Sequence, residues 1–222
     1  AEADTVFIVN ADAHIEKEAV EAVERGLKSL PLAACAGPQG AFVNFSLCTD
    51  YCYLDKGCFD RPVEIDAVSG FFFAVNRGLL NEHGIRFEET FTPCYFEEWD
   101  LGLQIRRASL KNYVVPTVAY EHHWSGTIRA LRSIAYMGHD ETAGEILLRN
   151  RQYFLSKWRY IARQSGRPDL LESGWKRYAI GQVKSLIVVG ESRQALQILE
   201  VLIGEMPDDF EVRALAKYVS LA

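Results

Sequence analysis

A strand, helix and strand pattern over residues 5–37 narrows this chain to the α/β class of folds. Residues 5–9 form a continuous apolar, β-branched run, which is typical of a buried strand. Residues 16–30 carry apolar side chains at helical spacing, and residues 32–36 form a second apolar run. In such a unit the crossover is right-handed, and ligands bind beyond the carboxyl ends of the strands. We therefore expect functional side chains in the polar stretch 10–14.

The sheet is expected to continue with two more strands. Residues 63–75 first alternate and then become continuously apolar, with Ser69-Gly70 as a break where backbone or ligand approaches closely. Residues 113–121 form the next strand, in which Pro116 places the centre at an edge or a bulge. We expect all these strands in one mixed sheet, with the helix packed on it. Residues 39–60 have no sustained period, so an irregular excursion is expected there.

The remainder of the chain, from about residue 128 onward, is expected to be all-helical, with no strand after residue 123. Helical patterns cover residues 130–137, 141–163, 172–188, 192–204 and 210–221. The last three resemble the second half of a tetratricopeptide repeat with the next helix attached. An ordinary helical cap fits the same pattern equally well, because stable repeat arrays need about three repeats and only about one and a half are visible here.

Charge and hydropathy exclude two classes of protein. The formal net charge of −6 over 222 residues disfavours a nucleic-acid-binding surface, because such surfaces need clustered lysine and arginine. No apolar run approaches the roughly 20 residues that span a bilayer. The first residues lack the basic and apolar regions of a secretory signal. We expect a cytoplasmic protein, free or peripheral to the inner face of the membrane, with no nucleic-acid partner and no membrane span.

Four short polar segments carry the candidate chemistry, and each lies at a predicted strand end or in a loop. They are residues 10–14, 68–70, 95–101 and 120–123. An α/β sheet would bring their carboxylates and imidazoles to one side, which favours a divalent metal together with a general base.

Two of these segments are the most specific. Asp12 and His14 are two positions apart, so an extended backbone points both side chains the same way, toward one ion or one diphosphate. Glu97, Glu98 and Asp100 place three carboxylates within four positions, beside aromatic residues. Desolvation and mutual repulsion are expected to raise at least one of these pKa values toward the range of a working base.

The order of the motifs resembles that of family-2-type, rhamnosyltransferase-like glycosyltransferases of the GT-A class. That family carries a strand ending in Asn-x-Asp, a Gly-Pro stop, a Val-Ser-Gly segment before an apolar run and an arginine, and a Gly-x-Phe-x-Glu-x-Phe segment. An aromatic-Glu-Asp-x-Asp-Leu segment, a proline-to-histidine strand end and a helix from asparagine to Lys-Trp follow. The matching residues are, in order, Val9 to Asp12, Gly37-Pro38, Val68 to Gly70, Arg77, Gly84 to Phe91, Phe96 to Leu101, Pro116 to His122 and Asn150 to Trp158. Each match is weak alone, but the agreement in order covers residues 5 to about 160.

The resemblance implies a hexosyltransferase-type enzyme that transfers a sugar, with inversion, from a nucleotide-diphosphate donor to a hydroxyl of a glycan, lipid or protein acceptor. A divalent metal, Mg or Mn, would stabilise the departing diphosphate. Glu98 matches the position of the family's base. The resemblance assigns Asp12, His14 and His122 to the metal, Glu98, Glu97 and Asp100 to catalysis, and Asn10, Ser69, Gly70, Trp99 and His123 to substrate binding.

This interpretation also divides the chain into three parts. Residues 1–127 would form a partial GT-A-like catalytic domain on the acceptor side, a mixed sheet flanked by helices. Residues 128–168 would form a helical extension packed on it, and residues 169–222 a tetratricopeptide-like tail that offers a surface to a protein partner.

Three departures from the family pattern carry consequences. The family's Asp-x-Asp becomes Asp12-Ala13-His14, which shifts the expected metal from Mg toward Mn or another imidazole-tolerant ion. The family's catalytic aspartate becomes Glu98, one methylene longer. The family's strands that bind the nucleotide base precede the matched region, so we expect a longer natural chain or a separate segment that supplies them. Without them the sheet would expose an apolar edge, which folded proteins rarely leave uncovered.

Two other classes of function stay open. The chain could be a catalytically inactive binding or scaffold module that acts through its helical tail. It could also be a zinc-dependent hydrolase built on Cys48, Cys52, Cys58 and a histidine, although no closed ligand set is visible. Reduced thiols are the simplest expectation for five cysteines in a chain of this size.

Overall fold

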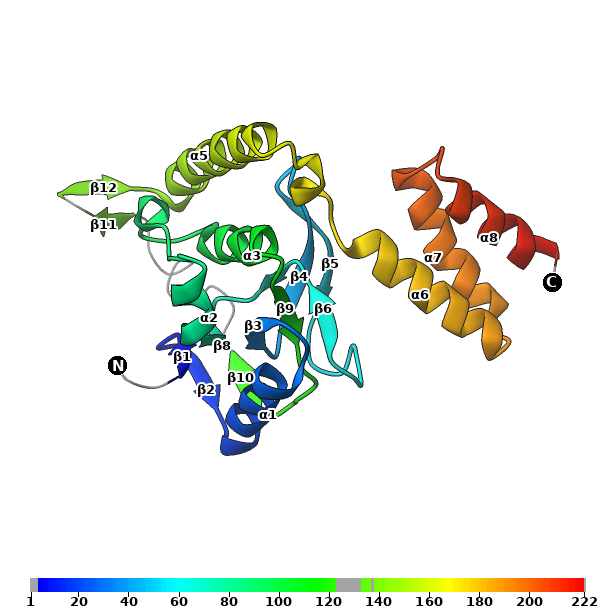
Figure 1. Ribbon diagram of the computed structural model, residues 1–222, viewed down its shortest axis with the longest axis horizontal. Coiled ribbons are helices and arrows are strands. Elements are labelled where there is room, and N and C mark those ends of the chain that lie inside the picture. Colours follow the sequence, from blue (N-terminus) through cyan, green and yellow to red (C-terminus); the bar gives the residue numbers. More distant parts are fainter. Residues whose placement is uncertain (1–3, 123–132, 137, 222) are drawn as a thin grey trace. The chain divides into compact units, whose positions relative to one another are not determined.

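The computed structural model describes residues 4–122, 133–136 and 138–221. The chain divides into two compact units, Ala1–Ser173 and Gly174–Ala222. The first is a mixed α/β unit with several sheets, and the second consists of helices (Figure 1).

The largest sheet has five strands in the order β1-β8-β3-β9-β6. Its strands are β1 (Thr5–Val9), β8 (Phe72–Asn76), β3 (Ala33–Gly37), β9 (Lys111–Val114) and β6 (Val63–Ile65). Strand β8 is antiparallel to both β1 and β3, and β9 is parallel to β3. The carboxyl ends of β1, β3 and β9 therefore meet at one edge of the sheet, beside the amino end of β8. We call this the carboxyl edge.

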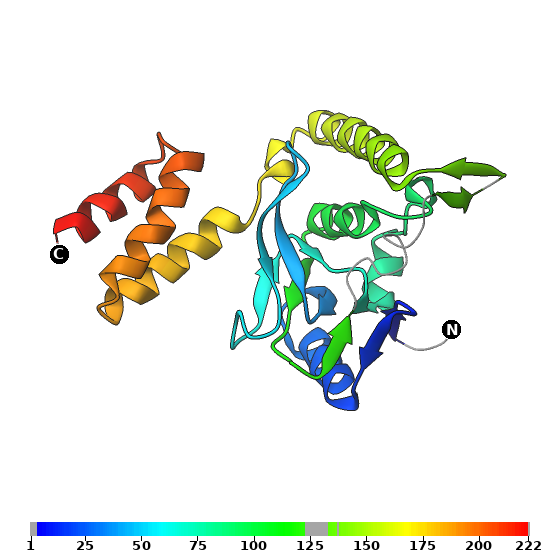
Figure 2. The same ribbon diagram turned by 180° about the vertical axis from the view of Figure 1, so that it is seen from behind.

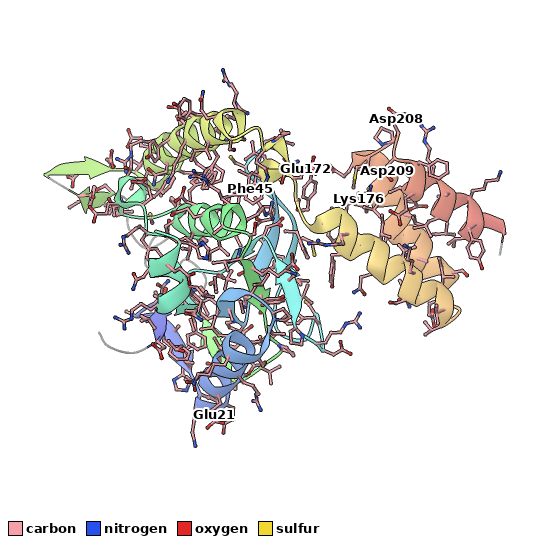
Figure 3. All side chains as sticks on the ribbon, in the orientation of Figure 1. Glu21, Phe45, Glu172, Lys176, Asp208 and Asp209 are labelled. Atoms are coloured by element: carbon pink, nitrogen blue, oxygen red, sulfur yellow. The ribbon has the colours of Figure 1, made fainter. Side chains whose placement is uncertain are left out.

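Helix α1 (Lys17–Ser29) packs on this sheet, as its apolar spacing predicted. Its residues Ala19, Val23 and Leu27 are buried in one cluster with side chains of β3 and β8. Glu21 lies on the exposed face of the helix and points away from the sheet (Figure 3).

Helix α3 (Glu97–Arg107) lies between the strands and the long helix α5 (Ala143–Gln164) in both views of the ribbon (Figures 1 and 2). A Cβ at Gly102 would stand 2.4 Å from the carbonyl oxygen of Asp66, so only glycine allows this approach. The buried Asp66 accepts a hydrogen bond from the backbone N–H of Val43 at 2.9 Å and pairs with Arg106 of α3. These contacts hold α3 against β7 (Ala67–Val68) and β9.

Residues 39–60 are not an irregular excursion, and that expectation was wrong. Strands β4 (Gly40–Asn44) and β5 (Thr49–Leu54) form a hairpin that joins β7 in a three-stranded sheet. Strand β4 is almost entirely buried, while β5 changes from exposed at Thr49 to buried at Leu54, so neither strand shows a period of two. The side chain of Asn44 closes the turn by accepting from the backbone N–H of Leu47 at 3.1 Å.

The expected single sheet is also corrected at residues 113–121. Strand β9 ends at Val114, and β10 (Tyr120–His122) pairs instead with β2 (Ala13–Ile15) in a separate two-stranded sheet. Pro116 follows β9 and has no backbone N–H to continue the ladder, which gives the physical reason for the break.

The expectation of helix over residues 130–137 and of no strand after residue 123 was wrong where the structure describes them. Strands β11 (Ile134–Tyr136) and β12 (His139–Glu141) form a hairpin ahead of α5. Gly138 in the turn has φ 81°, a conformation that glycine adopts without steric cost. Residues 130–132 and 137 of that predicted helix lie outside the described residues.

Helix α5 matches the pattern predicted over residues 141–163. Short elements that the pattern did not predict are α2 (Arg77–Glu82), η1 (Glu89–Phe91) and η2 (Pro168–Leu171). The residues of η2, and Glu172 and Ser173 after it, belong to the first compact unit.

The second unit contains α6 (Trp175–Val188), α7 (Ser192–Glu205) and α8 (Phe210–Leu221), close to the ranges predicted for the tail. Its own core includes Val183, Leu199 and Val212. Lys176 forms an ion pair with Asp209 within this unit (Figure 3). None of the helices that the structure describes has the length and apolarity needed to cross a bilayer.

Candidate functional site

The segment that leads into α3 has an unusual backbone. Tyr95 and Phe96 both adopt the left-handed region, with φ 76° and 77°, although neither is glycine. The Phe96 ring packs against Trp99 with centroids 5.2 Å apart and against Phe154 at 5.3 Å. Two such residues in sequence are strained by about 1–3 kcal/mol each, so the surroundings must hold them in place.

Asn150 of α5 supplies that restraint. Its side-chain Nδ2 donates to the carbonyl oxygens of Phe91 at 2.6 Å, Cys94 at 2.7 Å and Tyr95 at 3.3 Å. Asn150 is only 1% exposed, and its Oδ1 accepts from Nε of Arg149 at 3.2 Å, so both ends of the buried amide are bonded. One buried side chain thus fixes the loop that positions the first turn of α3.

Asp100 fixes α3 to α5 in the same way. Its Oδ1 accepts from Trp158 Nε1 at 2.7 Å and pairs with Lys157 Nζ at 2.8 Å, while its Oδ2 accepts from Gln104 Nε2 at 2.7 Å. The residue is fully buried and both oxygens have protein partners. Asp100 therefore lies beside the candidate base, but its contacts are with the scaffold.

Glu97 and Glu98 occupy the first turn of α3, and their carboxylates differ from that of Asp100. Among the described residues, Oε2 of each is buried without a hydrogen-bond partner. Burial, followed by the charge of Glu98, raises the pKa of Glu97 to about 8. Burial also raises the pKa of Glu98, and the charge of Asp50 adds to the rise. The expectation that at least one of these pKa values is raised is confirmed.

A cavity of about 390 Å³ opens beside Glu98. Three residues predicted from the sequence line it, namely Ser69, Glu98 and Trp99. The other lining residues are Ala41, Cys48, Asp50, Tyr53, Ala67, Val68, Tyr95, Phe96 and Leu147, none of them basic. Sequence reasoning missed Asp50 and Tyr53. They are three positions apart, so strict alternation would place them on opposite faces of the strand. The register shift between Phe42 and Val43 in the β4–β5 pairing adds one residue to β5 and lets both side chains reach the cavity.

Asp12 and His122 come together at the carboxyl edge of the five-stranded sheet. Nε2 of His122 lies 3.8 Å from Oδ1 of Asp12. The His122 ring stacks on Phe71 with centroids 4.3 Å apart. Gly70 precedes Phe71, and a Cβ at Gly70 would stand 3.9 Å from Cδ of Glu98. Phe71 thus contacts His122 and the adjacent Gly70 lies close to Glu98, so two consecutive residues approach both the Asp12–His122 pair and the cavity wall.

Two other predicted residues, His14 and Asn10, are exposed. His14 is exposed on β2, where it pairs in register with Glu121. Asn10 is exposed, and its backbone N–H donates to the Phe71 carbonyl at 2.7 Å. His123 lies outside the described residues.

The metal site remains a prediction, and it rests on two donors, the Asp12 carboxylate and the His122 imidazole. Within residues 4–122, 133–136 and 138–221, no group of three His, Cys, Asp or Glu side chains is arranged to hold an ion. A carboxylate and an imidazole nitrogen at close range fit Mn or a similar ion, provided that substrate oxygens complete the coordination. The described cysteines Cys48, Cys52 and Cys58 are free thiols that also form no such group, so the zinc-hydrolase alternative gains no support.

Comparison of the chain with known protein families, with curated proteins and with solved structures gives no match.

Proposed function

We propose that this chain is the acceptor-side part of a metal-dependent, inverting glycosyltransferase with a GT-A-like fold, in which Glu98 is the general base. The observation that carries the proposal is the carboxylate of Glu98, whose Oε2 is buried without a partner on the wall of a cavity of about 390 Å³. A buried carboxylate oxygen that has no partner among the described residues loses solvation without a compensating hydrogen bond, so a role in binding or proton transfer explains it best.

The proton transfer follows from the position of this group. The acceptor hydroxyl would donate its proton to Glu98 as its oxygen attacks the anomeric carbon from the cavity side. The bond from that carbon to the diphosphate oxygen breaks on the opposite side, so the configuration inverts. Because burial raises the pKa of Glu98, the carboxylate is a stronger proton acceptor than an exposed glutamate.

The leaving group would lie toward Asp12 and His122. These residues are joined to Glu98 through Phe71 and Gly70, so donor and acceptor would meet above Gly70. A divalent ion bound there would supply Lewis-acid stabilisation of the departing diphosphate. A nucleotide-diphosphate sugar is the corresponding donor.

The restraints around α3 support the same proposal. Asn150, Lys157 and Trp158 contribute no atoms to the cavity lining, yet they bond to the loop before Glu97 and to Asp100 after Glu98. A base must be held within about 0.5 Å of its working position, and bonds on both sides of Glu98 provide this rigidity.

The test is sugar transfer by the full-length protein, measured with a panel of nucleotide-diphosphate sugars and Mn. Replacing Glu98 by Gln keeps the size and hydrogen bonding but removes the proton acceptor, so transfer should fall by roughly a hundredfold or more while donor affinity stays nearly constant.

Glu89→Gln is the matched control, because Glu89 is an exposed glutamate of the same segment that no part of the cavity contacts. An active protein in which Glu98→Gln transfers sugar at the wild-type rate would refute Glu98 as the base. A protein with no transfer activity toward any donor, but with a ligand bound by its helical unit, would favour the scaffold function instead.

A further inference from the structure

The cavity has aromatic walls whose orientation is fixed. The Trp99 indole makes edge contacts with Phe96 at 5.2 Å and 82°, with Phe154 at 6.1 Å and 70°, and with Phe45 at 6.4 Å and 90°. Phe45 lies just beyond β4, close to α3 (Figure 3). Rigid aromatic rings supply a flat apolar surface at low entropic cost.

Tyr53 forms a second fixed wall. Its hydroxyl donates to Oε1 of Gln39 at 3.1 Å, and Gln39 in turn donates to Asp55. The hydroxyl of Tyr120 also donates to Asp55, at 2.8 Å. This hydrogen-bonded chain holds the Tyr53 ring in place, so the cavity does not depend on a ligand for its shape.

The charges that line the cavity are all negative. Asp50 stands at its exposed mouth and Glu98 on its wall, and no lysine, arginine or histidine is among the described lining residues. Arg151 and Arg159 lie near the lining residue Cys48, but neither arginine is itself part of the lining, and Nη2 of Arg151 donates to the Leu47 carbonyl at 2.8 Å. A ligand that carries a carboxylate or phosphate would therefore meet repulsion from Asp50 and Glu98, without a cation in the described lining to offset it.

We propose that the cavity binds an uncharged pyranose unit of the acceptor, and that Asp50 is a specificity-determining residue that excludes acidic sugars. The pyranose presents an apolar C–H face to Trp99 and hydroxyl donors to the carboxylates of Asp50 and Glu98. This inference rests on the proposed function, because it names the acceptor class of the same site. It adds Asp50, which lies on β5 and not on the helix that carries the base.

The test is binding of matched glycosides to the full chain by ligand-observed NMR, without any donor. The probes are methyl β-glucopyranoside and methyl β-galactopyranoside, each beside its uronic-acid counterpart, which differs only in the carboxylate at C6. The variant is Asp50→Asn, and the control is Asp60→Asn, an exposed aspartate outside the cavity lining. Circular dichroism verifies that both variants fold.

At low salt the wild type should bind at least one neutral glycoside roughly tenfold or more tightly than its uronic acid, since a partly screened unit charge a few ångströms away is worth that much. In Asp50→Asn this ratio should shrink at least about threefold, while Asp60→Asn leaves it unchanged.

Three results would overturn the inference: equal binding of neutral and acidic glycosides by the wild type, an unchanged ratio in Asp50→Asn, or no glycoside binding at all. The failure of this inference and that of the proposed function are distinguishable. Transfer that depends on Glu98 without the neutral preference removes only the inference. A neutral preference with transfer indifferent to Glu98→Gln removes only the assignment of the base.

Discussion

Replacing Asn150 by alanine should destabilise the first compact unit by about 2–4 kcal/mol. The change removes two short bonds, to the carbonyls of Phe91 and Cys94, and one longer bond to that of Tyr95. It also removes the bond that Oδ1 accepts from the half-exposed Arg149 at 3.2 Å, which water can replace. A buried acceptor left without a partner costs about 1–3 kcal/mol. Phe91 is buried, so its carbonyl oxygen would lose its partner without gaining water. Cys94 and Tyr95 are half-buried, so water can partly replace the bonds to their carbonyl oxygens.

The loss of activity in Asn150→Ala should exceed the loss of stability. Among the described residues no other side chain bonds to these three carbonyls, and the bond from Arg149 to the Thr92 carbonyl lies outside the left-handed pair, so Tyr95 and Phe96 lose their restraint. A displacement of the first turn of α3 by about 1 Å would cost roughly a hundredfold in transfer rate.

Urea unfolding measures the stability change, and the matched control is Asn81→Ala. Asn81 is exposed on α2, so its change should stay within about 0.5 kcal/mol. If Asn150→Ala unfolds within that same margin of the wild type, the three bonds do not restrain the loop as described. If stability falls but transfer does not, the loop does not position the base.

Three further predictions concern the cavity and its edge. Gly70→Ala should fold with unchanged or slightly higher stability, because the new Cβ meets only Cδ of Glu98, at 3.9 Å. The variant should nevertheless transfer sugar more slowly, because the methyl group narrows the space above the base. Thermal unfolding measures the first effect and a transfer assay the second. Glu97→Gln should stabilise the protein at about pH 9 and have little effect at about pH 4.5. The pKa of Glu97 in the folded protein, about 8, lies above its pKa in the unfolded chain, so the stability of the wild type falls as pH rises between the two. Urea unfolding at the two pH values checks the sign. Asp12→Asn should weaken Mn-dependent binding of a nucleoside diphosphate at least about tenfold, measured by calorimetry, and leave metal-independent binding unchanged. Equal Mn-dependent binding by the wild type and the variant would exclude Asp12 as a metal ligand.

The sequence predicted those parts of the fold whose signal is local. Strands β1 and β3 are continuous apolar runs, and α1 and α5 repeat their buried residues at helical spacing, so each is visible within one window of residues. The β4–β5 hairpin was missed because β4 is buried on both faces while β5 is half-exposed. The β11–β12 hairpin was missed because its three-residue strands are too short to show a period.

The candidate site was predictable where chemistry alone identifies a residue. Glu98, Ser69 and Trp99 were found because their residue types form a motif in the sequence. Asp50 was missed because it reaches the cavity only through the hairpin that brings β5 to α3. The scaffold contacts of Asp100 also depend on an element 58 residues away, through Trp158, and no local pattern reveals such a partner.

The pH dependence of kcat/KM for sugar transfer tests the central claim most directly, when wild type and Asp50→Asn are compared. A general base must be deprotonated, so activity should fall as pH falls through the pKa that burial has raised for Glu98. Because the charge of Asp50 adds to that rise, Asp50→Asn should move this acidic limb to lower pH. An acidic limb at the pKa of an ordinary exposed carboxylate, unmoved by Asp50→Asn, would contradict the assignment of Glu98 as the base.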